Sequence, residues 1–417
     1  MLNIGLIGLG NIGSFVYKLL KTSHLKREKV ILKKVCDIKI SKCRELNIPS
    51  NIFCTDFNRI IKDPTIDVII ELIGGIEPAK TILIESIKHN KHVITANKFL
   101  LAFHGKEIIN LAKEKNVQVR FEASVCAGIP IIKVLNQSFT SLDKISNLKG
   151  IINGTTNFIL STMQENKKTL YQALEIAKRR GIAERNYSLD IEGKDSLHKL
   201  TILNFLCFGT WINPQQISCE GIKHISLLDI SYAQELGYNI KLLASSKIEN
   251  RQLSSYVAPV LLPSIHPLSQ VREDYNALLL TSKFTGNLLF YGKGAGPKPT
   301  AMAVINDVLS INRGQKFEYR CTDNELNIKN IEDSENRFYI RFQAIDKPGV
   351  LAKISKILAS YNISIASVTQ KERREKKVVP IVMLTHEARY QDVKKAVEKI
   401  DKLDIVKSNS VFIRIEE

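Results

Sequence analysis

Two oppositely charged side chains, Asp195 and Lys199, stand one helical turn apart in a stretch with helical periodicity from Lys194 to Phe208. Residues at this spacing share one face of a helix, so the carboxylate can orient the ammonium group or hold a substrate beside it. A positioned ammonium group can stabilise and protonate an oxygen on which negative charge develops. The same spacing is also typical of an ordinary surface ion pair, so this pair alone does not decide between the two readings.

The segment GLGNIG near the N-terminus has the pattern G-x-G-x-x-G. It follows the strand-like residues Asn3 to Ile7 and opens the helix-like stretch Ser14 to Thr22, which is the context that a dinucleotide-binding turn requires. In such a turn Gly8 permits the tight bend, Gly10 lets the backbone approach a pyrophosphate, and Gly13 allows helix and strand to pack closely. The amide groups at the start of the helix then bind the anion.

Asp37 ends the second strand-like stretch, at the place where an acidic residue binds the ribose hydroxyl groups in NAD enzymes. Lys39 and Lys42 follow closely, and their positive charges could instead meet the 2'-phosphate of NADP. The choice between NAD and NADP therefore stays open.

Lys98 lies just beyond the strand-like residues His92 to Thr95. Open α/β sheets bind ligands at the carboxyl ends of their strands, so Lys98 can face both a nicotinamide ring and a substrate. An isolated lysine at such a position would more often be an ordinary surface charge, and its assignment depends on the neighbouring segments.

The elements that must position these residues follow from the pattern of apolar residues. Between residues 1 and 123 short apolar runs alternate with amphipathic stretches, which is typical of a parallel sheet with crossover helices and predicts a Rossmann-like dinucleotide-binding domain. Residues 124–312 change in character and are expected to form an α+β domain for substrate binding and dimerisation. Within them, residues 299–312 predict a helix that returns to the first domain.

Residues 313–336 are polar and charged and are expected to form a linker. Residues 337–417 then read strand, helix, strand, strand, helix, strand, which is the order of the ferredoxin-like fold. The expected class is therefore α/β, with a Rossmann-like domain, an α+β domain and a small ferredoxin-like domain. We expect residues 1 to about 320 to be a self-sufficient unit, because a polar linker separates them from the last domain.

Composition and charge exclude several classes of protein. The 417 residues carry a formal charge of +18, but the basic residues are dispersed, so we expect no nucleic-acid partner. The seven cysteines lack C-x-x-C spacing, which argues against a zinc site or a disulfide framework and favours a reducing cytoplasm. A start without a charged leader predicts no export, and the polar residues between Leu200 and Cys219 argue against a membrane helix.

Several segments resemble conserved blocks of the homoserine dehydrogenase family. They are DVIIELIGGIEPA at residues 67–79, TANK at 95–98, FEASVCAGIP at 121–130, NGTTNF at 153–158 and LDIEGKDSLHKL at 189–200. With shorter matches they extend over nearly the whole of residues 1–312. The resemblance implies the NADPH- or NADH-dependent reduction of L-aspartate 4-semialdehyde to L-homoserine, in the biosynthesis of threonine, methionine and isoleucine.

The resemblance also implies a role for each matching side chain. Lys199 is the implied proton donor, and Lys98 lies near the reacting oxygen. Glu184 and Asp195 bind the amino group of the substrate, supported by Asp190. These roles suit the residue types, because hydride delivery to an aldehyde builds an alkoxide that a nearby ammonium group stabilises. For the cofactor, the motif and the resemblance together indicate Gly8, Gly10, Asn11, Ile12, Gly13, Asp37, Lys98, Gly181 and Gly296.

The segment from Glu122 to Ile129 resembles the hinge that binds a monovalent cation in this family. The resemblance implies that the ion, with sodium expected, contacts the Glu122 carboxylate and the backbone carbonyl groups of Val125, Ala127 and Ile129. Ligation by oxygen atoms with little negative charge suits a hard, weakly charged ion.

The C-terminal segment resembles the ACT domain, a sensor of small molecules. The match is DKPGVL, which begins at Asp346, followed by ISI at Ile363. Asp346 and Gly349 shape the loop at which such domains hold amino acids. The resemblance implies threonine as the effector and a homodimer or homotetramer as the assembly. A purely structural, dimer-forming ACT domain is the alternative.

Two other functions are compatible with parts of the sequence. Aspartate-semialdehyde dehydrogenase requires a cysteine nucleophile, and Cys126 is the only cysteine near the expected site. A catalytically silent sensor would not need the two lysines and the carboxylates named above. One departure from the family pattern affects the detail of the substrate pocket, because Arg185, Asn186 and Tyr187 stand where an Asp-Pro pair is usual.

Overall fold

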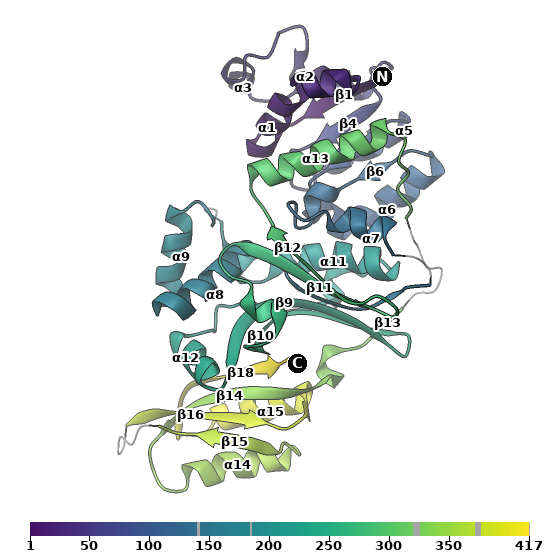
Figure 1. Cartoon of the computed structure of the whole chain (residues 1–417). Helices are drawn as coiled ribbons and strands as arrows, with labels where there is room; N and C mark the ends of the chain where they lie inside the picture. Colours follow the sequence, from purple (N-terminus) through teal and green to yellow (C-terminus); the bar gives the residue numbers. More distant parts are fainter. Residues whose placement is uncertain (140–141, 184–185, 320–325, 372–376, 417) are drawn as a thin grey trace. The chain divides into compact units, whose positions relative to one another are not determined.

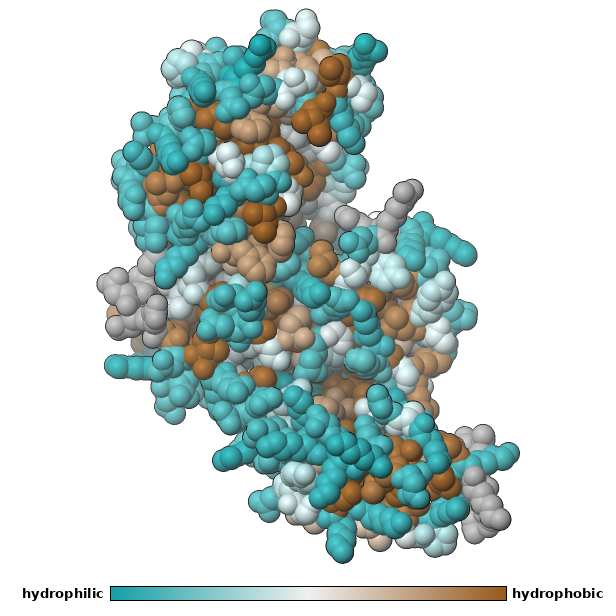
Figure 2. Space-filling view, turned by 180° about the vertical axis from the view of Figure 1, so that it is seen from behind, coloured by the Kyte–Doolittle hydropathy of each residue, from teal (hydrophilic) through white to brown (hydrophobic). Residues whose placement is uncertain are grey.

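The computed structural model describes residues 1–139, 142–183, 186–319, 326–371 and 377–416. Among these residues the strands form two large sheets, one parallel and one mixed, and helices pack against them (Figure 1). Hydrophilic side chains cover most of the face seen in Figure 2, with smaller apolar groups between them. The two sheets with their packed helices confirm the expected α/β class. Within the described ranges no helix has the length and apolar character that crossing a membrane requires.

The first sheet is parallel and has the strand order β3-β2-β1-β4-β5-β6. Its central strands are almost continuously apolar, as expected of strands that are buried on both faces. The order reverses between β1 and β4, which is the Rossmann arrangement and confirms the expected fold of this region. The strands are β1 (Leu2–Ile7), β2 (Val30–Cys36), β3 (Phe53–Cys54), β4 (Val68–Glu71), β5 (His92–Thr95) and β6 (Val119–Arg120).

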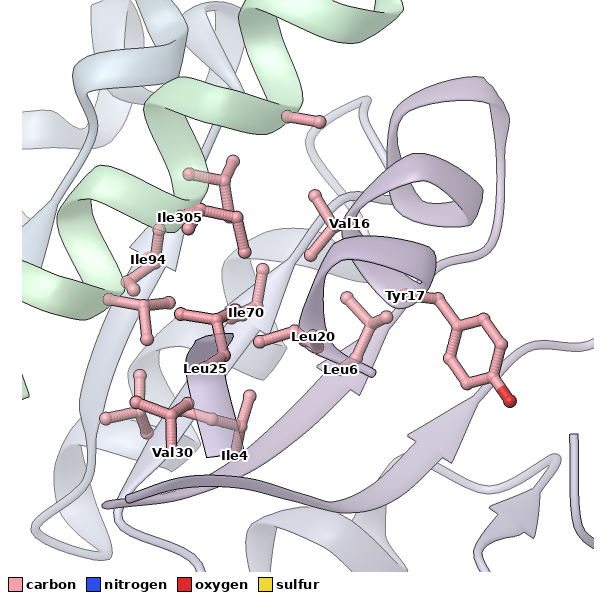
Figure 3. Packing of buried hydrophobic residues seen from close by; sticks show 14 of the residues in the cluster. Ile4, Leu6, Val16, Tyr17, Leu20, Leu25, Val30, Ile70, Ile94 and Ile305 are labelled. Carbon is pink, nitrogen blue, oxygen red and sulfur yellow. The ribbon is translucent and has the colours of Figure 1, made fainter. Parts of the chain in front are cut away.

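A later helix, α13 (Pro297–Asn312), packs on this sheet beside α1. Figure 3 shows Ile305 of α13 in the same core as Ile94 and Ile70 of the sheet and Val16 of α1. The core therefore fixes the helix that follows the glycine-rich turn. The other helices of this region are α1 (Asn11–Leu20), α2 (Ser23–Arg27), α3 (Ile40–Glu45), α4 (Asn58–Ile61), α5 (Ala79–Lys88), α6 (Lys98–Glu114) and α7 (Ile131–Gln137).

The second sheet has the strand order β12-β11-β7-β9-β10-β18-β14-β16-β15. Its longest hairpin, between β9 and β10, turns at Asn250 and Arg251, whose φ angles of 50° and 63° suit the tight turns that match the twist of paired strands. The strands of its first half are β7 (Ile145–Ile151), β8 (Ser218–Cys219), β9 (Tyr238–Glu249), β10 (Gln252–Pro263), β11 (Tyr275–Ser282) and β12 (Gly286–Lys293). The helices are α8 (Gly154–Asn166), α9 (Leu170–Arg179), α10 (Ser188–Ile191), α11 (Lys194–Phe208) and α12 (Leu227–Glu235).

The C-terminal part has the order strand, helix, strand, strand, helix, strand, which confirms the ferredoxin-like expectation. Its last strand, β18, pairs with β14 on one side and with β10 on the other, where Val260 and Leu261 are the partners of Arg414 and Ile415. The C-terminal sheet is thus continuous with that of the preceding segment. The elements are β13 (Asn327–Ile328), β14 (Glu335–Ile345), α14 (Val350–Ser360), β15 (Ile365–Thr369), β16 (Val378–Thr385), β17 (Ala388–Arg389), α15 (Tyr390–Asp401) and β18 (Val406–Ile415).

A buried ion pair joins α12 to the C-terminal strand β14. Arg341 donates from Nε to Oδ1 of Asp229 at 2.6 Å and from its terminal nitrogen to Oδ2 at 3.0 Å. The hydroxyl group of Tyr339 also donates to Oδ1 of Asp229, at 3.1 Å. Asp229 is 0% and Arg341 is 6% exposed, so the two charges neutralise each other away from water.

The chain divides into two compact units made of separate segments. The first contains Met1–Ser146, Leu197–Gln216 and Leu280–Glu325, and the second contains Asn147–Ser196, Ile217–Leu279 and Leu326–Glu417. Helix α11 begins in the second unit and continues into the first.

Candidate functional site

The glycine-rich turn of the first unit leaves an open space at the start of α1. Gly8 has a φ angle of 98°, and a Cβ atom on it would lie 2.8 Å from the backbone of Leu72. A Cβ atom on Gly13 would lie 1.9 Å from the carbonyl oxygen of Gly8. On Gly10, by contrast, a Cβ atom would meet nothing within 4 Å. The outer two glycines are therefore required by the fold, and Gly10 keeps a space open at the helix N-terminus, where Asn11 and Ile12 begin.

Asp37 is tied to this turn at the carboxyl edge of the sheet. Its Oδ2 accepts a hydrogen bond of 2.6 Å from the backbone N–H of Leu9, and its Oδ1 accepts one of 2.8 Å from the N–H of Lys39. Each oxygen retains a second lone pair that could accept a ribose hydroxyl group. The exposed Lys39 stands beside it, so the geometry suits either NAD or NADP.

A buried network holds the loops around Lys98. Oγ1 of Thr95, at the end of β5, donates to Oε2 of Glu71, at the end of β4, over 2.6 Å. The other oxygen of Glu71 accepts the N–H of Ile73 at 2.7 Å. Burial raises the pKa of the Glu71 carboxyl group, which is 0% exposed. The ends of two neighbouring strands are thus fixed together at the ligand-binding edge of the sheet.

Asn97 continues this network to the start of α6. Its backbone N–H donates to Oγ1 of Thr95 at 3.0 Å, and its side chain donates to the carbonyl oxygen of Gly75 at 2.6 Å. Its Oδ1 accepts the N–H of Leu100 at 3.1 Å and so caps the helix. Lys98 is the first residue of α6, and its backbone position is therefore set by the cap.

Helix α11 meets α6 within the same unit. The ring of His198 lies 5.0 Å from that of Phe99 and 5.7 Å from that of Phe103, measured between centroids. Phe99 and His198 directly adjoin Lys98 and Lys199, so this aromatic contact brings the two lysine-bearing segments together. Lys199 is only 6% exposed, which is unusual for a lysine outside a functional or paired position.

In the second unit one asparagine joins two of the expected carboxylates. The Nδ2 group of Asn153 donates to Oδ1 of Asp190 at 2.7 Å and to Oδ2 of Asp195 at 2.8 Å. Its Oδ1 accepts the N–H of Thr156 at 2.7 Å and caps α8. Two carboxylates held by one amide form a site with the charge to bind an ammonium group. Glu184, the third expected carboxylate, lies outside the described residues.

The Glu122 side chain binds the N-terminus of α7, beside a second buried carboxyl group. Its two carboxylate oxygens accept the backbone N–H groups of Ile132 at 3.0 Å and Lys133 at 2.8 Å. Its own N–H donates to Oδ2 of Asp307 at 2.9 Å. Burial, together with the charge of Asp307, raises the pKa of Glu122 to about 8. A nearby cation would favour the ionised form.

The carbonyl groups expected to join Glu122 at a cation belong to a buried turn. The exposed fractions are 0% for Val125, 8% for Ala127 and 2% for Ile129. The turn is held by hydrogen bonds from the N–H of Ala127 to the carbonyl oxygen of Gly294 at 3.1 Å and from the N–H of Ile129 to that of Cys126 at 2.7 Å. Within the described ranges no three acidic, histidine or cysteine residues gather in a metal-binding group.

The remaining expected residues are glycines at helix ends and one loop aspartate. Gly181 follows α9 with a φ angle of 69°, and Gly296 precedes α13 with one of 114°. Both angles favour glycine, so each residue has a structural reason to be there. Gly349, with a φ angle of 87°, precedes α14, and Asp346 accepts a hydrogen bond of 3.3 Å from the side chain of Gln370.

Four residues of these networks were not identified as functional from the sequence: Glu71, Thr95, Asn153 and Asp307. Glu71 and Thr95 lie within segments that resemble the family, and Asn153 opens a third. Asp307 gave no signal, because its partner Glu122 is 185 positions away in the chain.

Comparison with known proteins gives three family models that match in succession. The homoserine dehydrogenase NAD-binding domain matches residues 8–122, the homoserine dehydrogenase domain matches residues 130–309, and the ACT domain matches residues 338–404. A homoserine dehydrogenase of Synechocystis sp. is 37% identical, with 99% of both chains covered. That of Helicobacter pylori is also 37% identical, over 100% of this chain and 99% of the relative.

Solved structures agree with the sequence comparisons. The crystal structure of a homoserine dehydrogenase from Thiobacillus denitrificans has a TM-score of 0.91 and 36% identity, with 100% of this chain and 98% of that chain covered. That of Staphylococcus aureus at pH 7.5 has a TM-score of 0.78 and 32% identity over 100% of this chain. With relatives of this similarity along its full length, the chain belongs to the homoserine dehydrogenase family.

Proposed function

We propose that this chain reduces L-aspartate 4-semialdehyde to L-homoserine with Lys199 as the proton donor. The observation that supports the assignment most directly lies within the first unit. The dinucleotide turn and the cap of Lys98 stand at the carboxyl edge of one parallel sheet, and the contact of His198 with Phe99 brings α11 to the same lysine-bearing helix. A proton donor that is buried beside a dinucleotide edge suits a dehydrogenase better than a sensor.

Each group in the proposed reaction has a distinct task. The bound nicotinamide supplies the hydride that reduces the aldehyde carbon. The Lys199 ammonium group stabilises the alkoxide as it forms and gives it a proton, and Lys98 adds positive charge near the same oxygen. Asp195 and Glu184 hold the amino group of the substrate, and Asn153 fixes Asp195 relative to Asp190. Substrate held in this way needs little reorientation before hydride transfer.

We also propose a monovalent cation, with sodium expected, on the Glu122 carboxylate and the carbonyl groups of Val125, Ala127 and Ile129. The two buried carboxyl groups of Glu122 and Asp307 support this assignment, because a cation would offset their repulsion. Its role would be to hold the hinge rather than to act on the substrate.

Steady-state oxidation of L-homoserine with NAD⁺ and with NADP⁺ tests the activity and also decides the cofactor preference. The expected result is turnover with at least one of the two and formation of the semialdehyde. Turnover of the semialdehyde that required phosphate would instead indicate aspartate-semialdehyde dehydrogenase. If the chain bound a nicotinamide cofactor but turned over neither substrate, the sensor function would replace the enzymatic one.

Replacing Gly10 with valine is expected to weaken the binding of NADH and NADPH by about tenfold or more, which corresponds to about 1.4 kcal/mol. The valine Cβ atom would meet nothing within 4 Å, and the branched side chain would occupy the space at the start of α1 that the pyrophosphate needs. Titration calorimetry measures the affinity, and the thermal midpoint should stay that of the native chain. Gly13→Val is the contrasting variant, since its side chain would collide with Gly8 and prevent folding. Unchanged affinity in folded Gly10→Val would exclude this turn as the cofactor site.

The ACT domain is proposed to sense threonine or a related amino acid and to take part in a homodimer or homotetramer. Three large apolar side chains on it are well exposed, namely Leu351 at 43%, Val368 at 42% and Val378 at 45%. Apolar side chains also gather over the C-terminal part in Figure 2. Val368 belongs to β15, the edge strand of the sheet, and an exposed edge strand of this kind favours pairing with a second chain.

A chain ending at about residue 320 is expected to keep its turnover and to lose any response to threonine. Truncation removes Arg341 and uncovers the edge of β10, so the shortened chain should also carry Asp229→Asn to avoid an unpaired buried charge. Rates with and without threonine are compared with those of the full chain, and light scattering measures the assembly. A correctly assembled truncation that threonine still inhibits would place the sensor in the catalytic part. A full chain that ignores threonine and related amino acids would leave the ACT domain a structural role.

A further inference from the structure

Two cysteines occupy paired positions on neighbouring strands of the first sheet. Cys36 ends β2 and Cys54 ends β3, and the two are direct partners in the parallel pairing. Partners on adjacent strands lie about 4.8 Å apart and point to the same face. A disulfide needs a Cα separation of about 4.4 to 6.8 Å, so the backbone at this pair already has the spacing of a cross-link.

The pairing places the two thiol groups close enough to interact. The Cys54 thiol donates to the carbonyl oxygen of Asp56 at 3.4 Å and to that of Val35 at 3.6 Å. Interaction with the Cys36 thiol, aided by the positive charges of Lys34 and Arg59, lowers the pKa of Cys54 to about 7. Cys54 is therefore the more readily ionised of the two thiols and the better nucleophile, and Cys36 lies beside it as the second thiol.

Access to the pair is through the edge of the sheet. Cys36 is 3% and Cys54 is 8% exposed, so a reagent reaches them only when the edge opens. β3 is the outermost strand of the sheet, and it has only two residues. Short edge elements open locally at much lower free energy than the core of a domain does.

The same two residues support the cofactor edge through their backbones. The carbonyl oxygen of Cys36 accepts the N–H of Gly8 at 2.9 Å, and that of Cys54 accepts the N–H of Asp37 at 3.2 Å. Asp37 in turn binds the N–H of Leu9. A change in the strand ends at this pair is therefore transmitted to the glycine-rich turn and to the carboxylate that would meet the ribose.

We propose that Cys36 and Cys54 are a thiol pair that a small disulfide such as oxidised glutathione converts to an intramolecular disulfide, and that this cross-link weakens cofactor binding. The Cys54 thiolate attacks one sulfur of the small disulfide and releases one thiolate. The Cys36 thiol then gives up its proton and attacks Sγ of Cys54, which releases the second. The protein loses two electrons and two protons, and the small disulfide is reduced to two thiols. The effect on the cofactor rests on the proposed dinucleotide site.

The full chain is equilibrated with glutathione over a range of ratios of the oxidised to the reduced form, the remaining thiols are alkylated, and the peptides are identified by mass spectrometry. The expected product is one linked peptide that joins Cys36 to Cys54. Cys36→Ser should instead retain glutathione on Cys54, and Cys54→Ser should form neither product. Cys43→Ser, which changes a cysteine of α3 outside the pair, is the matched control and should form the linked peptide like the native chain. If both thiols remain fully alkylated at the most oxidising ratios, the pair is not redox-active.

The second half of the proposal is tested by calorimetric titration of NADPH and NADH into the reduced and the oxidised chain. Oxidation is expected to weaken the affinity about fivefold or more, and reduction should restore it. Equal affinities would separate the disulfide from the cofactor site. A reduced chain that binds neither cofactor would contradict the proposed function while leaving the peptide result valid, so the two failures are distinguishable.

Discussion

Replacing Lys199 with alanine is expected to lower kcat by about a hundredfold or more while the affinity for the cofactor stays almost unchanged. The ammonium group acts on charge that appears only as the hydride arrives, so its removal affects the transition state rather than the binding of the cofactor. Alanine leaves only a methyl group at this buried position, and α11 should keep its contact between His198 and Phe99. Steady-state rates and calorimetric titration of NADPH and NADH measure the two quantities separately.

Lys194 provides the matched control on the same helix. It is exposed and forms an ion pair of 2.7 Å with Glu192, so Lys194→Ala should change kcat little. Lys199→Arg keeps the positive charge but hardly releases a proton, and we expect it to recover little activity. A Lys199→Ala variant that retained most of the native rate would remove this residue from the chemical step.

Replacing Arg341 with methionine is expected to destabilise the chain by about 3 to 5 kcal/mol, because the buried carboxylate of Asp229 would lose its counter-charge. The carboxylate would keep hydrogen bonds from Tyr339 and from Ser226, whose Oγ donates to Oδ2 of Asp229 at 2.5 Å. Neither is charged, so neither replaces the guanidinium. Urea denaturation followed by circular dichroism measures the change.

Two further variants separate the charge effect from loss of packing. Arg341→Met combined with Asp229→Asn should recover much of the lost stability, since no unpaired charge is left in the interior. Arg389→Met removes an exposed ion pair with Glu335, and its effect should stay below about 1 kcal/mol. An Arg341→Met variant as stable as the native chain would show that water reaches Asp229.

Much of the fold could be predicted from local sequence patterns. Strands such as β1 and β4 can be predicted because each is a short apolar run with turn residues beside it. The glycine-rich turn can be predicted because all of its residues are adjacent in the sequence. Spacing alone leaves Asp195 and Lys199 as a possible surface ion pair, and the family resemblance implies the roles of the lysines and carboxylates. In the structure, Asp190 and Asp195 both accept hydrogen bonds from the side-chain amide of Asn153.

What could not be predicted are contacts between residues far apart in the chain. Arg341 and Asp229 are 112 positions apart, and Cys36 and Cys54 are neighbours only once β2 and β3 pair. The pairing of β18 with β10 is a contact of the same kind, because the sequence places each of these strands in a different predicted domain. Such contacts depend on which elements the fold brings together. Hydrophobic periodicity predicts the elements but not which of them become neighbours.

The central position of β18 has a consequence for the order in which the protein is made. Ribosomes deliver β18 after all the other strands described, yet it lies between β10 and β14 and pairs with both. The parallel sheet closes early during synthesis, apart from the covering helix α13, whereas the mixed sheet stays divided until its last strand emerges. A nascent chain therefore carries an open edge at Val260 and Leu261 from the time that β10 emerges until β18 is made, which makes this edge the place where a chaperone would be needed.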